Sequence, residues 1–104
     1  MKIILAQPQH LDHVSKFYRR VCGADVPREE LLSKQRTAEL HRAGELAVVI
    51  AAHQKTIIGC GLGWPQPWND SLEIGEITVD PQVPERPKIA KALFQAVQRL
   101  GITE

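Results

Sequence analysis

The sequence predicts an α+β fold in the order strand, helix, helix, three strands, helix. Residues 45–52 form a continuous apolar run rich in valine, which is typical of a buried strand. Residues 72–79 contain several β-branched side chains and predict another strand. Between residues 89 and 100, apolar residues recur with helical period, which indicates an amphipathic helix. A length of 104 residues favours one domain covering residues 1–104.

The first two elements are a short strand and a helix. Residues 2–6 are β-like, and Gln7-Pro8 ends this run before a helix predicted over residues 10–21. Gly23 is well placed to end that helix. The apolar face of the helix comprises Leu11, Val14, Phe17, Tyr18 and Val21.

A second helix is predicted to begin near Asp25-Val26-Pro27 and to run to Gly44. The aspartate is a candidate cap, and proline is favoured in a first helical turn. This helix is highly charged and weakly apolar. We therefore expect it to lie over an edge of the sheet or to cover a cleft.

The middle of the chain predicts a hairpin. Residues 45–52 and 56–62 are the two strands, joined by a loop of three to four residues. Gly59, Gly61 and Gly63 alternate along the second strand, so one of its faces carries no side chains. Such a face permits close approach by a ligand or by a helix.

Composition limits the function classes. The formal net charge of +1 gives no general attraction to nucleic acid. No apolar run approaches the roughly 20 residues that span a bilayer, and residues 1–9 do not form a signal peptide. We therefore expect a cytoplasmic protein in which Cys22 and Cys60 are reduced thiols, with no membrane and no nucleic-acid partner.

Two segments together carry a family resemblance. GELAVVIAAHQKTIIGCGLG, and EIGEITVDP followed by KIAKALFQAVQRL, resemble strands two to four and the following helix of the GNAT superfamily of acyl-CoA N-acyltransferases. The resemblance implies a central, mostly antiparallel sheet flanked by helices. It also implies a short form that is truncated after the helix following the fourth strand and lacks the C-terminal strands.

The resemblance implies transfer of an acetyl or acyl group from acyl-CoA, with acetyl-CoA as donor, to a small-molecule or peptide amine. The alternative is a catalytically inactive GNAT-like module that oligomerises or binds a protein partner. Because the family's next strand is missing, we expect one exposed sheet edge, which proteins usually cover. A homodimer covering that edge is the expected assembly.

The family binds the donor pyrophosphate through a glycine-rich loop, R/Q-x-x-G-x-G/A, between the fourth strand and the helix. Carried onto residues 85–90, the motif is matched only by Ala90. Glu85 stands in place of Arg or Gln, and Lys88 in place of the first Gly. Pro84 and Pro87 have no N–H to offer a phosphate.

Cationic side chains are expected to substitute in part for the missing amides. Arg86, Lys88 and Lys91 surround the start of the helix and can bind phosphate directly. By resemblance, the backbone of Val79 and its neighbours binds the donor's carbonyl or pantetheine. Together with Ala90 these residues are the predicted cofactor-binding set.

Glu73 and Glu76 are the candidate general bases, because several family members use a glutamate on this strand. Strand alternation places them on opposite faces. The competing interpretation is that both are solvent-facing or paired residues, and it is favoured for either one taken singly.

Four other residues are candidates for a metal site or for catalysis. His10 and His13 beside Asp12 have a spacing seen in metal sites, but a solvated helix start is favoured and no metal is predicted. Cys60 is read as a core thiol rather than a nucleophile, and Tyr18 as core rather than as a general acid.

Trp64 and Trp68 lie in a loop predicted over residues 63–70. They can line an acceptor pocket or form a protein interface, where tryptophan is enriched. The expected open sheet edge favours the interface.

Overall fold

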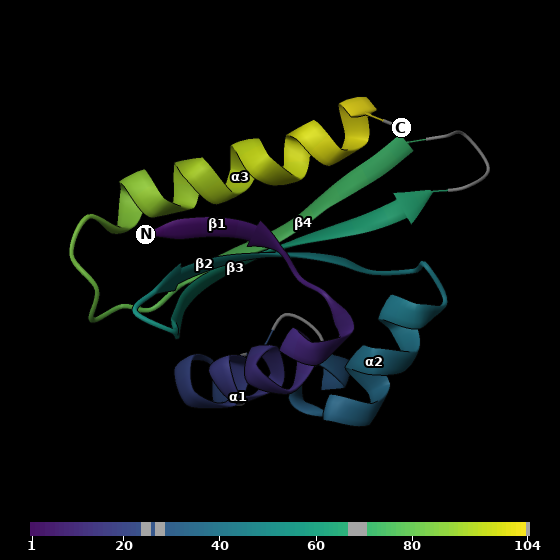
Figure 1. The fold of residues 1–104 in the computed structure, drawn as a ribbon, viewed down its shortest axis with the longest axis horizontal. Coiled ribbons are helices and arrows are strands. Elements are labelled where there is room, and N and C mark those ends of the chain that lie inside the picture. Colours follow the sequence, from purple (N-terminus) through teal and green to yellow (C-terminus); the bar gives the residue numbers. More distant parts are fainter. Residues whose placement is uncertain (24–25, 27–28, 67–70, 104) are drawn as a thin grey trace.

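A computed structural model describes residues 1–23, 26, 29–66 and 71–103. Its core is a four-stranded antiparallel sheet in the order β1-β2-β3-β4 (Figure 1). The predicted α+β class and the antiparallel sheet are therefore confirmed. The strands are β1 (Lys2–Leu5), β2 (Ala47–His53), β3 (Thr56–Gln66) and β4 (Ser71–Val79).

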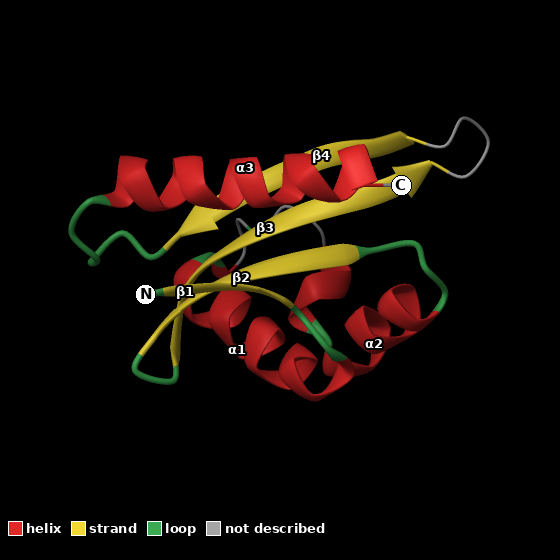
Figure 2. Cartoon of the chain, turned by 45° about the horizontal axis from the view of Figure 1, so that its top comes forward, coloured by secondary structure: helices red, strands yellow, loops and turns green. Residues whose placement is uncertain are grey.

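Helices cover both faces of the sheet. Two of them, α1 (Leu11–Val21) and α2 (Lys34–Arg42), lie on one face, and α3 (Arg86–Thr103) lies alone on the other (Figures 1 and 2). Single 3₁₀ turns precede α1 and α2, at Pro8–His10 and Glu29–Leu32. The sheet thus separates two apolar layers.

The layer beneath α1 is built from the apolar stripe that the sequence predicts. Phe17 and Tyr18 are buried with their rings 5.4 Å apart in an edge-to-face arrangement. Leu31 closes this layer, and Ile50 and Leu62 contribute from the sheet. Tyr18 is therefore a core residue, as predicted.

The layer beneath α3 depends on the glycines of β3. Ile89, Leu93 and Val97 are the buried stripe of the helix. A Cβ at Gly59 would lie 2.9 Å from Leu93 Cδ1, and one at Gly61 would lie 2.9 Å from Val97 Cγ2. The bare face of β3 thus admits a helix rather than a ligand.

Strand β4 contains a bulge that the sequence analysis missed. Gly61 pairs with Ile77 and Gly63 pairs with Ile74, so one residue on β3, Leu62, faces two on β4, Gly75 and Glu76. Because of the extra residue, the neighbouring positions Gly75 and Glu76 lie on the same face of the sheet instead of on opposite faces.

The predicted boundaries of the second helix and of the hairpin turn were wrong. The second helix is interrupted: α2 begins only after Ser33, whose side chain accepts a hydrogen bond from the Arg36 N–H. Its predicted start at residues 25–27 lies mostly outside the described residues. The hairpin turn has two residues, Gln54 and Lys55, both with positive φ (50° and 69°), rather than three to four.

Strand β3 is longer than predicted. It continues to Gln66, and Pro65 pairs with Leu72, although residues 63–70 were predicted to form a loop. Trp64 is therefore a strand residue, whereas Trp68 lies outside the described part of the chain. No helix among the described residues combines the length and apolar character needed to cross a membrane.

Candidate functional site

An acidic hollow lies over β4 on the same face of the sheet as α1 and α2. It has a volume of about 440 Å³ and is formed entirely by β3 and β4. On β4, Glu73 pairs with Trp64 and Thr78 pairs with Cys60. Trp64 and Cys60 both pack in the layer beneath α1, so Glu73 and Thr78 lie on that same face of the sheet. The residues lining it are Leu62, Trp64, Glu73, Ile74, Gly75, Glu76 and Ile77.

Glu73 and Glu76 share this face, so the prediction that they lie on opposite faces was wrong. The bulge is the reason, since it inserts one residue between them and shifts Glu76 onto the side of Thr78. Both glutamates are solvent-exposed. Two carboxylates in one open hollow provide a proton acceptor and an attraction for a cationic amine.

Trp64 forms one wall of the hollow against Gly75. A Cβ at Gly75 would lie 2.6 Å from the Trp64 indole nitrogen, so only glycine permits this contact. Trp64 is half-buried. Trp64 thus lines the hollow, whereas its role in an acceptor pocket or at a protein interface stays a prediction. A glycine inside a strand is a known signal for a bulge and would have indicated this arrangement.

Tyr18 lies beneath the hollow. Its hydroxyl is buried near Thr78 but makes no hydrogen bond of standard geometry within the described structure. Burial raises the pKa of Tyr18 well above its ordinary value, and Cys60, Cys22 and Glu76 act in the same direction. The phenol is therefore held in its neutral form.

The predicted cofactor-binding residues gather where β4 passes into α3. Arg86 is the first residue of α3, and Arg86, Lys88 and Lys91 are all exposed. None of the three forms a salt bridge with another described residue. Val79 and Ala90 are half-buried, and Val79 packs in the α3-side layer. The helix start is thus a cationic surface.

Most backbone N–H groups between β4 and α3 are already used within the protein. Those of Gln82 and Val83 bond to Asp80, and those of Lys88 and Ile89 bond to the Glu85 carbonyl. Three prolines, at positions 81, 84 and 87, have none. Among the described residues of this loop, only the N–H groups of Glu85 and Arg86 have no hydrogen-bond acceptor.

This arrangement fits an anionic ligand in part. Two amides and three cationic side chains can contact a pyrophosphate, whereas a glycine-rich cradle would offer more amides. Glu85 has a φ of 60°, a left-handed conformation that favours glycine, and it places a negative charge beside the cations. The loop therefore has the backbone shape of a glycine turn without the glycine.

The loop is anchored by an ion pair that the sequence analysis did not anticipate. Arg20 Nη1 lies 2.7 Å from Asp80 Oδ2, and Arg20 Nη2 donates to the Ile57 carbonyl oxygen at 3.1 Å. The Gln82 N–H lowers the pKa of Asp80 most, and Arg20 lowers it further. Arg20 and Asp80 are too far apart in sequence for any local pattern to connect them.

The remaining candidates are accounted for by packing. Cys60 is fully buried, and burial raises the pKa of its thiol, so it remains protonated. Cys22 and Cys60 are free thiols. His10 Nδ1 accepts a hydrogen bond from the Gln7 N–H at 2.9 Å. The described residues contain no group of three or more His, Cys, Asp or Glu side chains arranged around a common metal position.

Comparison with known proteins gives a structural match only. No protein-family model and no curated protein matches the sequence. The aminoglycoside 6'-N-acetyltransferase from Enterococcus faecium matches with a TM-score of 0.75 and 18% identity, over 99% of this chain and 56% of that one. A ribosomal-protein-alanine N-acetyltransferase from Brucella melitensis biovar Abortus 2308 matches with a TM-score of 0.68 and 14% identity, over 95% and 69%.

An aminoglycoside N-acetyltransferase in complex with CoA matches with a TM-score of 0.65 and 27% identity, over 98% of this chain and 71% of that one. Together these matches show that the chain has the fold of the GNAT acetyltransferases, as the two sequence segments predicted. The chain spans 56% to 71% of the length of these three structures.

Proposed function

We propose that this chain is a GNAT-type N-acetyltransferase that moves an acetyl group from acetyl-CoA to an amine. The observation that carries the proposal is the placement of Glu73, Glu76 and Trp64 around one hollow on β4. The same strand leads directly to the cationic start of α3. An acceptor site and a donor-binding surface are thus joined by one rigid element, which favours a fixed geometry for transfer.

The residues of the hollow have separate tasks. The two carboxylates attract a protonated amine, and one of them accepts the ammonium proton so that the nitrogen lone pair becomes nucleophilic. The Trp64 ring offers an aromatic wall on which a cation or an apolar acceptor can rest. Bound acetyl-CoA supplies the activated thioester, and Arg86, Lys88 and Lys91 hold its phosphates.

The test is acetyl transfer measured by release of free thiol, with a panel of polyamines, aminoglycosides and N-terminal peptides. Loss of a general base costs about 10²–10⁴-fold in rate, so Glu73→Gln or Glu76→Gln is expected to lower turnover by that order. Glu45→Gln, an exposed glutamate before β2, is the matched control. Equal rates for wild type, both single variants and the double variant would exclude this role for the hollow.

The second candidate is a non-catalytic module that binds a protein partner or a second copy. The small number of N–H groups left in the loop between β4 and α3 favours it. β4 is also the last strand of the sheet and pairs only with β3 among the described residues. Solution mass measured with and without acetyl-CoA separates the two, because the module oligomerises without any response to the donor.

A further inference from the structure

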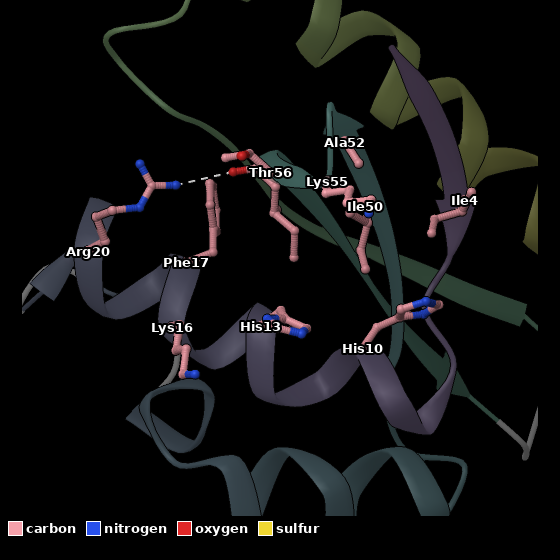
Figure 3. Close-up of a pocket in the computed structure, with 11 residues that line it drawn as sticks. Ile4, His10, His13, Lys16, Phe17, Arg20, Ile50, Ala52, Lys55 and Thr56 are labelled. Carbon is pink, nitrogen blue, oxygen red and sulfur yellow. Dashed lines mark hydrogen bonds between the residues drawn. The ribbon is translucent and has the colours of Figure 1, made fainter.

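A second cavity lies on the α1 side of the sheet, away from β4. It has a volume of about 510 Å³ and lies between α1, β1 and the β2–β3 hairpin (Figure 3). Such a volume is within the usual range for small-molecule sites. The acidic hollow and this cavity share no lining residue. The donor and acceptor surfaces described above therefore do not account for it.

The floor of the cavity is apolar. Phe17 and Ile50 are buried there, while Ile4, Ala52 and Ile57 are partly exposed and complete the surface. Figure 3 shows Ile4, Ile50 and Ala52 on the sheet, His13 and Phe17 on α1, and His10 in the turn that precedes α1. An apolar ligand body would displace water from this surface, which is the main favourable term in binding.

The rim of the cavity is cationic. Lys16, Arg20 and Lys55 line it together with two histidines, and no carboxylate is among its described lining residues. Lys16 already pairs with Asp12 at 3.4 Å, and Arg20 with Asp80 at 2.7 Å. Lys55 has no carboxylate partner among the described residues. One cationic charge is therefore left for a ligand.

Two further features concern His10 and Lys55, which both line the cavity. The Gln7 N–H bonds to His10 Nδ1, so the proton of that ring is on Nε2, which is a donor. Lys55 has a φ of 69°, and its turn neighbour Gln54 has a φ of 50°. Two-residue hairpin turns of this kind strongly prefer Asn-Gly, and retained strain is concentrated at ligand sites.

From this combination we propose that the cavity binds an apolar monocarboxylate, such as a medium-chain fatty acid or an aryl acid. The apolar floor takes the hydrocarbon, and Lys55 with the His10 Nε2–H takes the carboxylate. A single uncommitted lysine matches one negative charge better than the two of a phosphate.

The experiment titrates octanoate into the full chain and follows backbone amides by ¹H–¹⁵N NMR. Binding of octanoate is expected to be saturable and to change the chemical shifts of backbone amides in the β2–β3 hairpin and in α1. Lys55→Met keeps the apolar stem and should weaken binding about two- to fivefold, the range of a solvent-exposed ion pair. Lys34→Met, at an exposed lysine of α2 that does not line this cavity, should leave octanoate affinity unchanged.

Two more probes separate the contributions. Octanol lacks the carboxylate and should bind the wild-type chain more weakly than octanoate does. The ratio of the two affinities should be close to the ratio of the octanoate affinities of wild type and Lys55→Met. Ala52→Leu narrows the cavity and should abolish binding without changing the urea midpoint of unfolding. The proposal is overturned by equal affinities for octanol and octanoate, by tighter binding of inorganic phosphate, by an unchanged affinity in Lys55→Met, or by no saturation at millimolar octanoate.

Discussion

Glu73 and Glu76 lie on one face of β4, although they are three positions apart along the strand. In a regular strand an odd separation places two side chains on opposite faces. The bulge opposite Leu62 breaks that alternation and brings both carboxylates into the hollow beside Trp64. The acidic character of the hollow therefore depends on one inserted residue.

Gly75 is the residue on which this geometry depends most directly. Gly75→Ala places a methyl group 2.6 Å from the Trp64 indole nitrogen, and the ring must move. We expect a loss of about 1–3 kcal/mol in unfolding free energy, the usual cost of overpacking. Urea denaturation measures the loss.

The double variant Gly75→Ala, Trp64→Ala is the control for that prediction. Removing the indole removes the clash, so adding Gly75→Ala to Trp64→Ala should cost much less than it does in the wild type. Equal costs in the two backgrounds would show that Gly75 is needed for backbone conformation rather than for the contact with Trp64.

The Arg20–Asp80 pair predicts a response to acid. The pKa of Asp80 is lower in the folded chain than the value of about 3.9 for a free aspartate, so the ionised form stabilises the fold. This contribution is complete above the unfolded pKa and is lost as the pH falls through the folded pKa. Stability measured between about pH 6 and pH 2 should fall across that window.

Asp80→Asn should be less stable than wild type at neutral pH by about 1–3 kcal/mol and should show a flatter acid dependence. Asp12→Asn is the matched control, because Asp12 pairs with Lys16 at 3.4 Å on the exposed surface of α1. Its effect should be much smaller than that of Asp80→Asn, because solvent screens a surface ion pair. An equal effect of the two substitutions would mean that the loop anchor contributes no more than a surface pair.

Much of the fold followed from local patterns, and the exceptions have common physical causes. The α3 stripe was predicted correctly because Ile89, Leu93 and Val97 repeat with helical period. The bulge in β4 could not be predicted by alternation, since register depends on pairing with β3. Strand β3 passes through Pro65 because proline is tolerated where no ladder donor is required.

The candidate site shows the same division. Glu73 and Glu76 were identified from the family resemblance. That they share one face could not be predicted, because it depends on which β3 residue pairs with each residue of β4. The Arg20–Asp80 anchor joins α1 to the end of β4 and has no sequence signal at all. The cationic surface at the start of α3 could be predicted from the sequence alone, because Arg86, Lys88 and Lys91 are close in sequence.

Glu85 provides a prediction about the loop. At a φ of 60° an L residue pays a steric cost of about 1–2 kcal/mol that glycine does not. Glu85→Gly should therefore raise the unfolding free energy by about 0.5–1 kcal/mol after allowing for the greater entropy of unfolded glycine. Glu85→Ala removes the charge but keeps the strain, so it should show no such gain in urea denaturation.

Cys60 provides a prediction about reactivity. Because burial raises the pKa of its thiol, Cys60 should resist alkylation by iodoacetamide in the native chain. Cys22 is only half-buried and should react first. Mass spectrometry of the modified peptides assigns the order, and faster labelling of Cys60 would contradict its burial in the core.

Calorimetric titration of acetyl-CoA tests most directly whether this chain uses an acyl donor. Acetyl-CoA should bind the wild-type chain saturably. The triple variant Arg86→Met, Lys88→Met, Lys91→Met should bind it at least tenfold more weakly, since charge-assisted bonds contribute about 1.5–3 kcal/mol each. No heat up to millimolar acetyl-CoA, or equal affinity in the triple variant, would contradict this proposal.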